Sequence, residues 1–158
     1  MTPAAWLAPL LAAAAPAAAP AEAPALAAWH GNWAGEGMAF GRPATATLEI
    51  GPAPDGATRL AYRLTVGGAP AYGAEGLYRL DAKGRVAGSW TDSTGRTRPV
   101  AGAVAADLWW THWGSADIEI GRSTYALEAG GVLRVRDSVL QADGGWRLFA
   151  ELSYRRTD

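Results

Sequence analysis

Apolar and polar side chains alternate with period two along most of the chain beyond residue 29. Residues 58–66 place four apolar side chains on one face, namely Leu60, Tyr62, Leu64 and Val66. Residues 132–140 and 146–155 follow the same rule. Such alternation predicts strands with one buried and one solvated face, and no stretch shows the 3.6-residue period of a helix of three turns.

Glycine-rich turn signals separate these segments. Pro54-Asp55-Gly56, Gly67-Gly68 and Asp143-Gly144-Gly145 supply residues that tight hairpin turns need. About ten strands are predicted, over residues 31–40, 44–50, 58–66, 71–80, 85–92, 97–104, 107–113, 117–128, 131–140 and 145–155. We therefore expect an all-β fold, a single antiparallel up-and-down barrel, because closure removes both exposed sheet edges.

The first 28 residues differ in composition from the rest. They contain 15 Ala and 5 Pro but no Gly, Lys or Arg. An apolar stretch over residues 4–15, followed by small residues and Pro, is typical of a secretory signal, with cleavage after Ala19-Pro20-Ala21 or Ala12-Ala13-Ala14. The alternative is a disordered Ala/Pro arm. The stretch is too short and too interrupted by Pro for a membrane span, so we expect a periplasmic or secreted barrel domain over residues 29–158.

Composition removes several classes of function. The 158 residues carry a net charge of −1 and no basic stripe, so a nucleic-acid partner is not expected. The absence of cysteine excludes disulfides, thiolate metal sites and a cysteine nucleophile. No Gly-x-Ser-x-Gly motif is present to support a serine hydrolase. One domain of this size predicts a monomer or a weak dimer.

The first predicted strand carries the motif Gly31-x-Trp33-x-Gly35-x-Gly37. This motif resembles the opening of calycin-type barrels, which include lipocalins, fatty-acid-binding proteins and nitrobindin-like haem barrels. Residues 88–95 and the terminal Tyr154-Arg155-Arg156 also resemble a group of uncharacterised, exported calycin-like bacterial proteins. The resemblance implies that Trp33 closes one barrel end and that Arg155 or Arg156 packs over its ring. It does not extend to the haem-ligating histidine of nitrobindin-like proteins, because residues 131–154 contain none.

His112 lies in the aromatic run Leu108-Trp109-Trp110-Thr111-His112-Trp113. We expect Trp110 and His112 to share an inward face, which leaves Trp109 and Trp113 outside. An imidazole among indoles can contact a ligand, ligate haem iron or act as a base, and it can equally be a packed residue at the barrel rim. A lone His makes no zinc site, so no metal or other cofactor is expected.

Charged residues also fall on predicted inward faces. Asp92 and Asp137 each share a face with apolar side chains, and Arg122 is the predicted partner that would compensate a buried carboxylate. Both aspartates can alternatively cap turns. Glu119, Ser123 and Tyr125 are expected to form cross-strand pairs on the outer surface. Four indoles are predicted to face inward, Trp33, Trp90, Trp110 and Trp146.

Taken together, the pattern predicts a barrel that binds a small, mostly apolar or amphipathic molecule in its interior. The candidate ligand-binding residues are Tyr62, Trp90, Asp92, Trp110, His112, Arg122 and Asp137. Two alternatives remain open at this point. One is an enzyme that uses His112 or a buried carboxylate for acid–base chemistry. The other is an envelope-associated interaction module whose exposed Trp109 and Trp113 meet a protein or a membrane.

Overall fold

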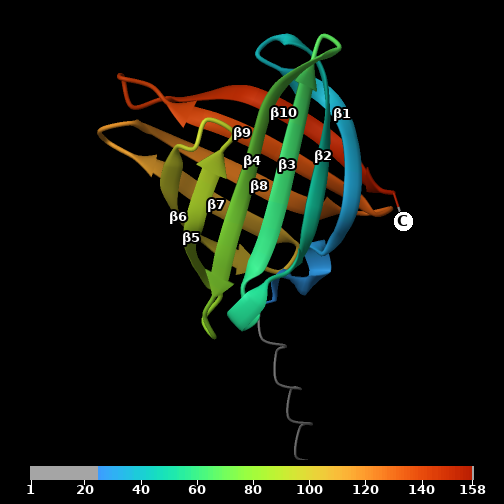
Figure 1. The fold of residues 1–158 in the computed structure, drawn as a ribbon, viewed down its shortest axis with the longest axis vertical. Coiled ribbons are helices and arrows are strands. Elements are labelled where there is room, and N and C mark those ends of the chain that lie inside the picture. Colours follow the sequence, from blue (N-terminus) through green and yellow to red (C-terminus); the bar gives the residue numbers. More distant parts are fainter. Residues whose placement is uncertain (1–24, 158) are drawn as a thin grey trace, which may run out of the picture.

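A computed structural model describes residues 25–157 as a closed antiparallel barrel of ten strands (Figure 1). The strands are β1 (Gly31–Ala39), β2 (Arg42–Pro52), β3 (Thr58–Val66), β4 (Ala69–Leu80), β5 (Arg85–Asp92), β6 (Thr97–Ala105), β7 (Leu108–Ser115), β8 (Glu119–Glu128), β9 (Val132–Leu140) and β10 (Trp146–Arg156). Two short 3₁₀ turns accompany them, η1 (Leu26–Trp29) and η2 (Pro54–Gly56). The predicted all-β, up-and-down barrel is confirmed.

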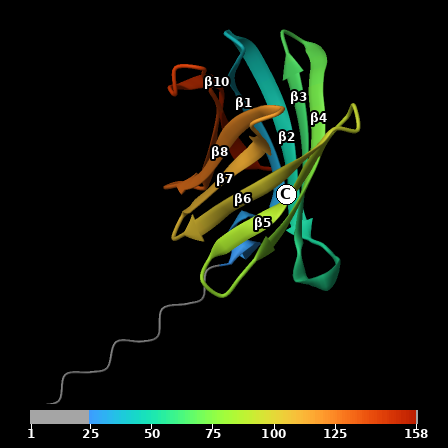
Figure 2. The same ribbon diagram turned by 90° about the vertical axis from the view of Figure 1, so that its left-hand side faces the viewer.

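Each strand pairs with its neighbours in the chain, and the last strand pairs with the first. Gly35 lies opposite Tyr154 where β1 meets β10, which closes the sheet. The two views of Figures 1 and 2 show strands wrapped around a common interior. No helix within residues 25–157 has the length and apolar character needed to cross a membrane. The predicted export signal falls mainly on residues 1–24, outside the described part of the chain.

One end of the barrel is closed by η1, drawn in blue in Figure 1. Trp29 and Trp33 are fully buried there, and the Trp33 Nε1–H donates to the Trp29 carbonyl over 2.9 Å. The Arg156 guanidinium lies 4.3 Å from the centre of the Trp33 ring and donates to the Ala28 carbonyl over 3.0 Å. The contact expected from the family resemblance is therefore present, with Arg156 rather than Arg155 as its cation.

Large rings fill the same end of the interior. Trp109 is completely buried and meets Tyr78 edge-on at 4.9 Å between ring centres. Its opposite neighbour, Tyr125, stacks on it at 4.4 Å. Because these rings interlock, the end of the barrel next to η1 is solid. The opposite end, formed by the turns β1–β2, β3–β4, β5–β6, β7–β8 and β9–β10, is more open.

Three strands present faces opposite to those predicted: β7, the first part of β10, and β8, where Ser123 and Tyr125 are buried inside rather than on the outer surface. In β7, Trp109 and Thr111 are buried inside, whereas His112 is exposed on the outer surface next to Trp110. The prediction of outward Trp109 and Trp113 and inward Trp110 and His112 is therefore wrong. The error arises because β7 carries aromatic rings on both faces. Alternation then separates the residues of the two faces, but it does not show which face lies inside the barrel.

The second reversal lies in β10 and comes from a β-bulge. The register with β9 shifts between Leu148 and Ala150, which leaves Phe149 as an extra residue. Trp146 and Leu148 therefore lie on the outer surface, while Phe149 faces the cavity. The prediction that Trp146 faces inward is wrong because a strict period of two cannot cross a bulge.

Candidate functional site

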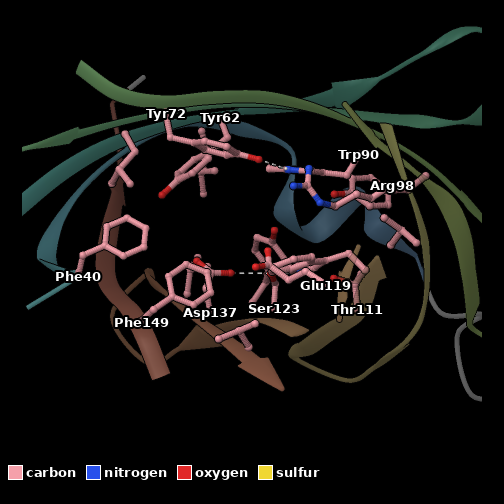
Figure 3. A pocket seen from close by; sticks show the side chains of 18 of the residues that line it. Phe40, Tyr62, Tyr72, Trp90, Arg98, Thr111, Glu119, Ser123, Asp137 and Phe149 are labelled. Carbon is pink, nitrogen blue, oxygen red and sulfur yellow. Dashed lines mark hydrogen bonds between the residues drawn. The ribbon is translucent and has the colours of Figure 1, made fainter. Parts of the chain in front are cut away.

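A cavity of about 210 Å³ occupies the open half of the barrel (Figure 3). It lies among side chains from nearly every strand, and most of its wall is aromatic or aliphatic. The aromatic residues nearest the opening are Phe40, Tyr62, Tyr72, Trp90, Trp113 and Phe149. Small-molecule sites are commonly concave and apolar with a few placed polar groups, and this cavity has that character.

One wall is a cluster of three rings from β3, β4 and β5. The ring centre of Tyr62 lies 6.1 Å from that of Tyr72 and 6.2 Å from that of Trp90. The Trp90 Nε1–H donates to the Tyr72 hydroxyl over 2.9 Å. This bond fixes the indole and the phenol relative to each other, so the wall presents a defined surface to a ligand.

Two phenylalanines meet at the rim. Phe40 stacks on Phe149 with 5.4 Å between ring centres and an angle of 12° between planes. Phe40 sits in the β1–β2 turn with a φ of 52°, followed by Gly41 with a φ of 73°, which is the left-handed pair of a two-residue hairpin turn. A bulky residue at positive φ is uncommon. The turn carries its ring over the opening, where 59% of Phe40 is exposed.

The facing wall carries a hydrogen-bonded chain of polar groups, on β7, β8 and β9. Asp137, Ser123 and Trp113 form a chain in which the Ser123 hydroxyl donates to Asp137 Oδ1 over 2.5 Å. The Trp113 Nε1–H donates in turn to the Ser123 oxygen over 3.1 Å. Figure 3 shows Asp137 and Ser123 across the cavity from Tyr62 and Tyr72.

This chain fixes the direction of the Ser123 proton. An indole N–H can only donate, so it occupies a lone pair of Ser123 and leaves the hydroxyl hydrogen for Asp137. Oδ1 of Asp137 is thereby an acceptor in either protonation state, and any proton on this carboxyl resides on Oδ2. Burial raises the pKa of Asp137 to about 6, while the hydrogen bond from Ser123 acts in the opposite direction.

Glycine on a neighbouring strand makes this arrangement possible. Gly121 lies opposite Trp113 in the β7–β8 ladder, and a Cβ on Gly121 would overlap the six-membered ring of that indole. The absence of a side chain lets the ring lie flat over the strand, with its N–H within reach of Ser123. The position of the hydrogen-bonded chain therefore depends on one missing methyl group.

A second carboxylate, Asp92, is paired inside the barrel with Arg98. Arg98 Nη1 lies 2.9 Å from Asp92 Oδ2, and the two side chains are 10% and 6% exposed. Asp92 Oδ1 accepts from the Thr94 hydroxyl over 2.5 Å and from the Thr94 and Arg96 backbone N–H groups. The bond from Thr94, followed by that from Arg98, holds the pKa of Asp92 well below its usual range.

Asp92 thus both caps the β5–β6 turn and pairs with an interior cation, whereas the sequence left turn capping and pairing inside the barrel as alternatives. Arg98 lines the cavity, and its buried Nε has no hydrogen-bond partner among residues 25–157. The prediction that Arg122 compensates the interior carboxylates is wrong, because Arg122 is exposed on the outer face of β8. Arg98, which the sequence analysis did not single out, is the interior cation.

Three of the seven predicted ligand-binding residues come together in the cavity wall: Tyr62, Trp90 and Asp137. Asp92 lies behind the wall and reaches it through Arg98. Trp110, His112 and Arg122 lie outside the barrel and cannot touch a molecule in the cavity. A haem bound inside would receive no iron ligand from His112, and an enzyme acting in the cavity could not use it as a base.

The three outer residues form a separate cluster with Trp146. The His112 ring stacks on Trp146 at 5.7 Å, and the Arg122 guanidinium lies 4.6 Å from the centre of the same indole. Trp110 meets His112 edge-on at 5.3 Å. The three rings and the guanidinium group therefore contact one another through ring–ring and cation–π interactions on the outer surface of β7, β8 and β10.

Sequence reasoning missed several cavity residues, among them Tyr72, Arg98, Trp113, Ser123 and Phe149. Ser123 was expected on the outer surface, which is wrong, because it is 5% exposed and faces the interior. A usable signal existed for Arg98, which shares parity with the apolar Val100 and lies across the β5–β6 hairpin from Trp90. The other four depended on the face of β7 and β8 and on the two bulges, at Leu64–Thr65 and Leu148–Ala150.

Comparison with known proteins gives no family assignment. No model of a known protein family matches the chain, and a search of curated proteins returns no match. The barrel and its cavity are therefore the basis for a functional assignment.

Proposed function

We propose that the protein is an exported, calycin-like barrel that binds a small, mostly apolar molecule in the cavity at its open end. The observation that carries this proposal is the difference between the two ends of one interior. Beside η1 the rings interlock, whereas toward the opposite rim aromatic side chains surround about 210 Å³ of space. The Trp33–Arg156 contact and the leader-like composition of residues 1–28 support the calycin-like and exported parts of the proposal.

The size of the cavity limits the ligand. An engineered apolar cavity of about 150 Å³ in another protein holds benzene. A volume of about 210 Å³ therefore suits a single ring with a short substituent. Transfer of the ligand's hydrocarbon from water drives binding, at about 0.8 kcal/mol per buried CH₂ group. The Phe40–Phe149 pair covers part of the opening and contributes the outermost apolar contacts.

The proposal is tested with 2-phenylethanol, a neutral single-ring compound, titrated into the full chain and followed by tryptophan fluorescence and calorimetry. Trp90 and Trp113 line the cavity and should report binding. A Val135→Phe variant fills the cavity from β9 and should abolish the signal. The matched control is Val132→Phe on the outer face of the same strand, which should leave it unchanged. Equal responses from both variants, or none from the natural chain, would overturn the proposal.

A further inference from the structure

The free oxygen of Asp137 points to the chemistry of the ligand. We infer that the cavity binds an organic amine in its protonated form, a single aromatic ring on a short chain, with Asp137 Oδ2 as the partner of the ammonium group. This inference rests on the proposed function and specifies its ligand class. The hydrogen bonds of Asp137, the charges around it and the rings that face it support this ligand class.

The two carboxyl oxygens of Asp137 differ in their hydrogen bonds. Oδ1 is occupied by the Ser123 hydroxyl, whose orientation is set by Trp113. This is the one hydrogen bond that residues 25–157 make to the carboxyl group, so Oδ2 is left with its lone pairs. Asp137 is partly exposed and lines the cavity. Oδ2 is therefore a fixed acceptor that a ligand inside the barrel can reach.

The charged groups of the described residues leave the Asp137 carboxylate without a counter-ion. Within residues 25–157 no Lys, Arg or His forms an ion pair with Asp137, and the nearest interior cation, Arg98, is held by Asp92. Arg147 and Glu119 lie at the rim with opposite charges. An ionised carboxylate without a partner in an enclosed site is unfavourable. A bound ammonium group supplies the missing positive charge, whereas a bound anion would add a second negative charge beside it.

The phenols around Asp137 do not supply a counter-charge. Burial raises the pKa of Tyr62, Tyr78, Tyr125 and Tyr154 above the ordinary value for tyrosine, and burial likewise raises the pKa of Tyr72. All of them are neutral in the physiological range. Asp137 is consequently the titrating group of this interior near neutral pH, and the charge of the site follows its protonation.

The aromatic rings opposite Asp137 indicate the chemistry of the rest of the ligand. The faces of Tyr62, Tyr72 and Trp90 stand across the cavity from Asp137 (Figure 3). Aromatic faces carry negative electrostatic potential and attract cations, while they also pack against another ring. A ligand with an ammonium end and one ring matches both walls, and the cavity volume excludes much larger bodies.

The experiment compares three probes of nearly equal size by calorimetry with the full chain at pH 7.5: 2-phenylethylamine, 2-phenylethanol and 3-phenylpropionate. We expect the amine to bind about tenfold or more tighter than the alcohol, because hydrogen bonds to charged groups contribute more than neutral ones. The anion should bind most weakly. In Asp137→Asn the ratio of the amine affinity to the alcohol affinity should fall to about one.

Glu119→Gln is the matched control, since it removes one negative charge at the rim rather than at Oδ2. It should preserve the preference for the amine. Affinity measured against pH gives a second readout on the natural chain, which does not depend on the folding of a variant. The amine should lose affinity as Asp137 is protonated below a pH of about 6, whereas the alcohol should not.

The outcomes separate the two proposals. Binding of the alcohol without preference for the amine, or an amine preference that survives Asp137→Asn, overturns the inference and leaves the proposed function standing. Tightest binding of the anion also overturns the inference. Failure of all three probes to bind overturns the proposed function together with the inference.

Discussion

The buried carboxyl group of Asp137 should make the protein less stable at neutral pH than in mild acid, and Asp137→Asn should remove this penalty. In the folded state the pKa of Asp137 is raised from 3.8 to about 6. The folded protein therefore binds a proton more tightly than the unfolded chain does. The stability that this proton provides is complete below a pH of about 3.8 and is lost as the pH rises through about 6.

The magnitude follows from the size of the shift. A shift of one pKa unit corresponds to about 1.4 kcal/mol, so the change from 3.8 to about 6 amounts to about 3 kcal/mol at neutral pH. Asp137 is partly exposed, so its carboxylate is not fully desolvated and about 3 kcal/mol is an upper value. Asparagine keeps a carbonyl oxygen for the Ser123 hydroxyl and carries no charge, so the variant isolates the ionisation of the carboxyl group.

The assay is chemical denaturation of both proteins at several pH values between 4 and 8. The variant should be more stable than the natural chain by about 2 to 3 kcal/mol at pH 7.5, and the difference should shrink toward zero near pH 4. The difference between the two proteins cancels the contributions of the other titrating groups. A difference that does not vary with pH, or one that grows in acid, would refute the assignment of Asp137 as a carboxyl group that is enclosed in the cavity without a counter-charge.

Three further predictions concern the closed end, the cavity wall and the outer cluster. Arg156→Ala removes the cation over the indole of β1 and should lower stability by about 0.5 to 1 kcal/mol in thermal denaturation, whereas Arg155→Ala, which lacks this contact, should change it little. Gly121→Ala forces the neighbouring indole away from its hydroxyl partner and should cost about 1 to 3 kcal/mol, with altered near-ultraviolet circular dichroism; Gly51→Ala, with open space at its Cβ, is its control. His112→Ala should leave the affinity for 2-phenylethanol unchanged. A loss of binding would contradict the placement of the His112 side chain on the outer surface of β7.

The architecture was predictable because the signals for it are local and redundant. Strands of period two separated by tight turns determine a meander, and the unfavourable edges of a meander favour closure. The inner face of β3 was also predictable, since Arg59 and Arg63 occupy its other side. On β9, Arg134 and Arg136 identify the outer face in the same way, so Asp137 was correctly placed inside.

The prediction of the inward face failed where both faces of a strand are apolar, because alternation then does not distinguish the buried face from the exposed one. In β7 both faces hold indoles, and hydrophobicity alone cannot choose between Trp109 and Trp110. In β8 the error had another cause: Arg122 shares parity with the apolar Ile118 and Ile120, which indicated an inward face, but Ile118 is exposed. The partner of Asp92 was missed because Arg98 precedes Pro99, and a proline inside a strand indicates an edge, a bulge or a strand start rather than a buried cation.

The bulge at Phe149 makes this ring separable from the rest of the fold. On either side of it, Leu148 pairs with Ser138 and Ala150 pairs with Asp137, which are consecutive positions of β9. A one-codon deletion of Phe149 would thus leave a regular ladder with every other pairing intact, and would remove half of the stacked phenylalanine pair. Ligand exchange should accelerate, while the wall formed by Tyr62, Trp90 and Asp137 keeps its place, so the speed of entry can be changed apart from the contacts deeper in the cavity.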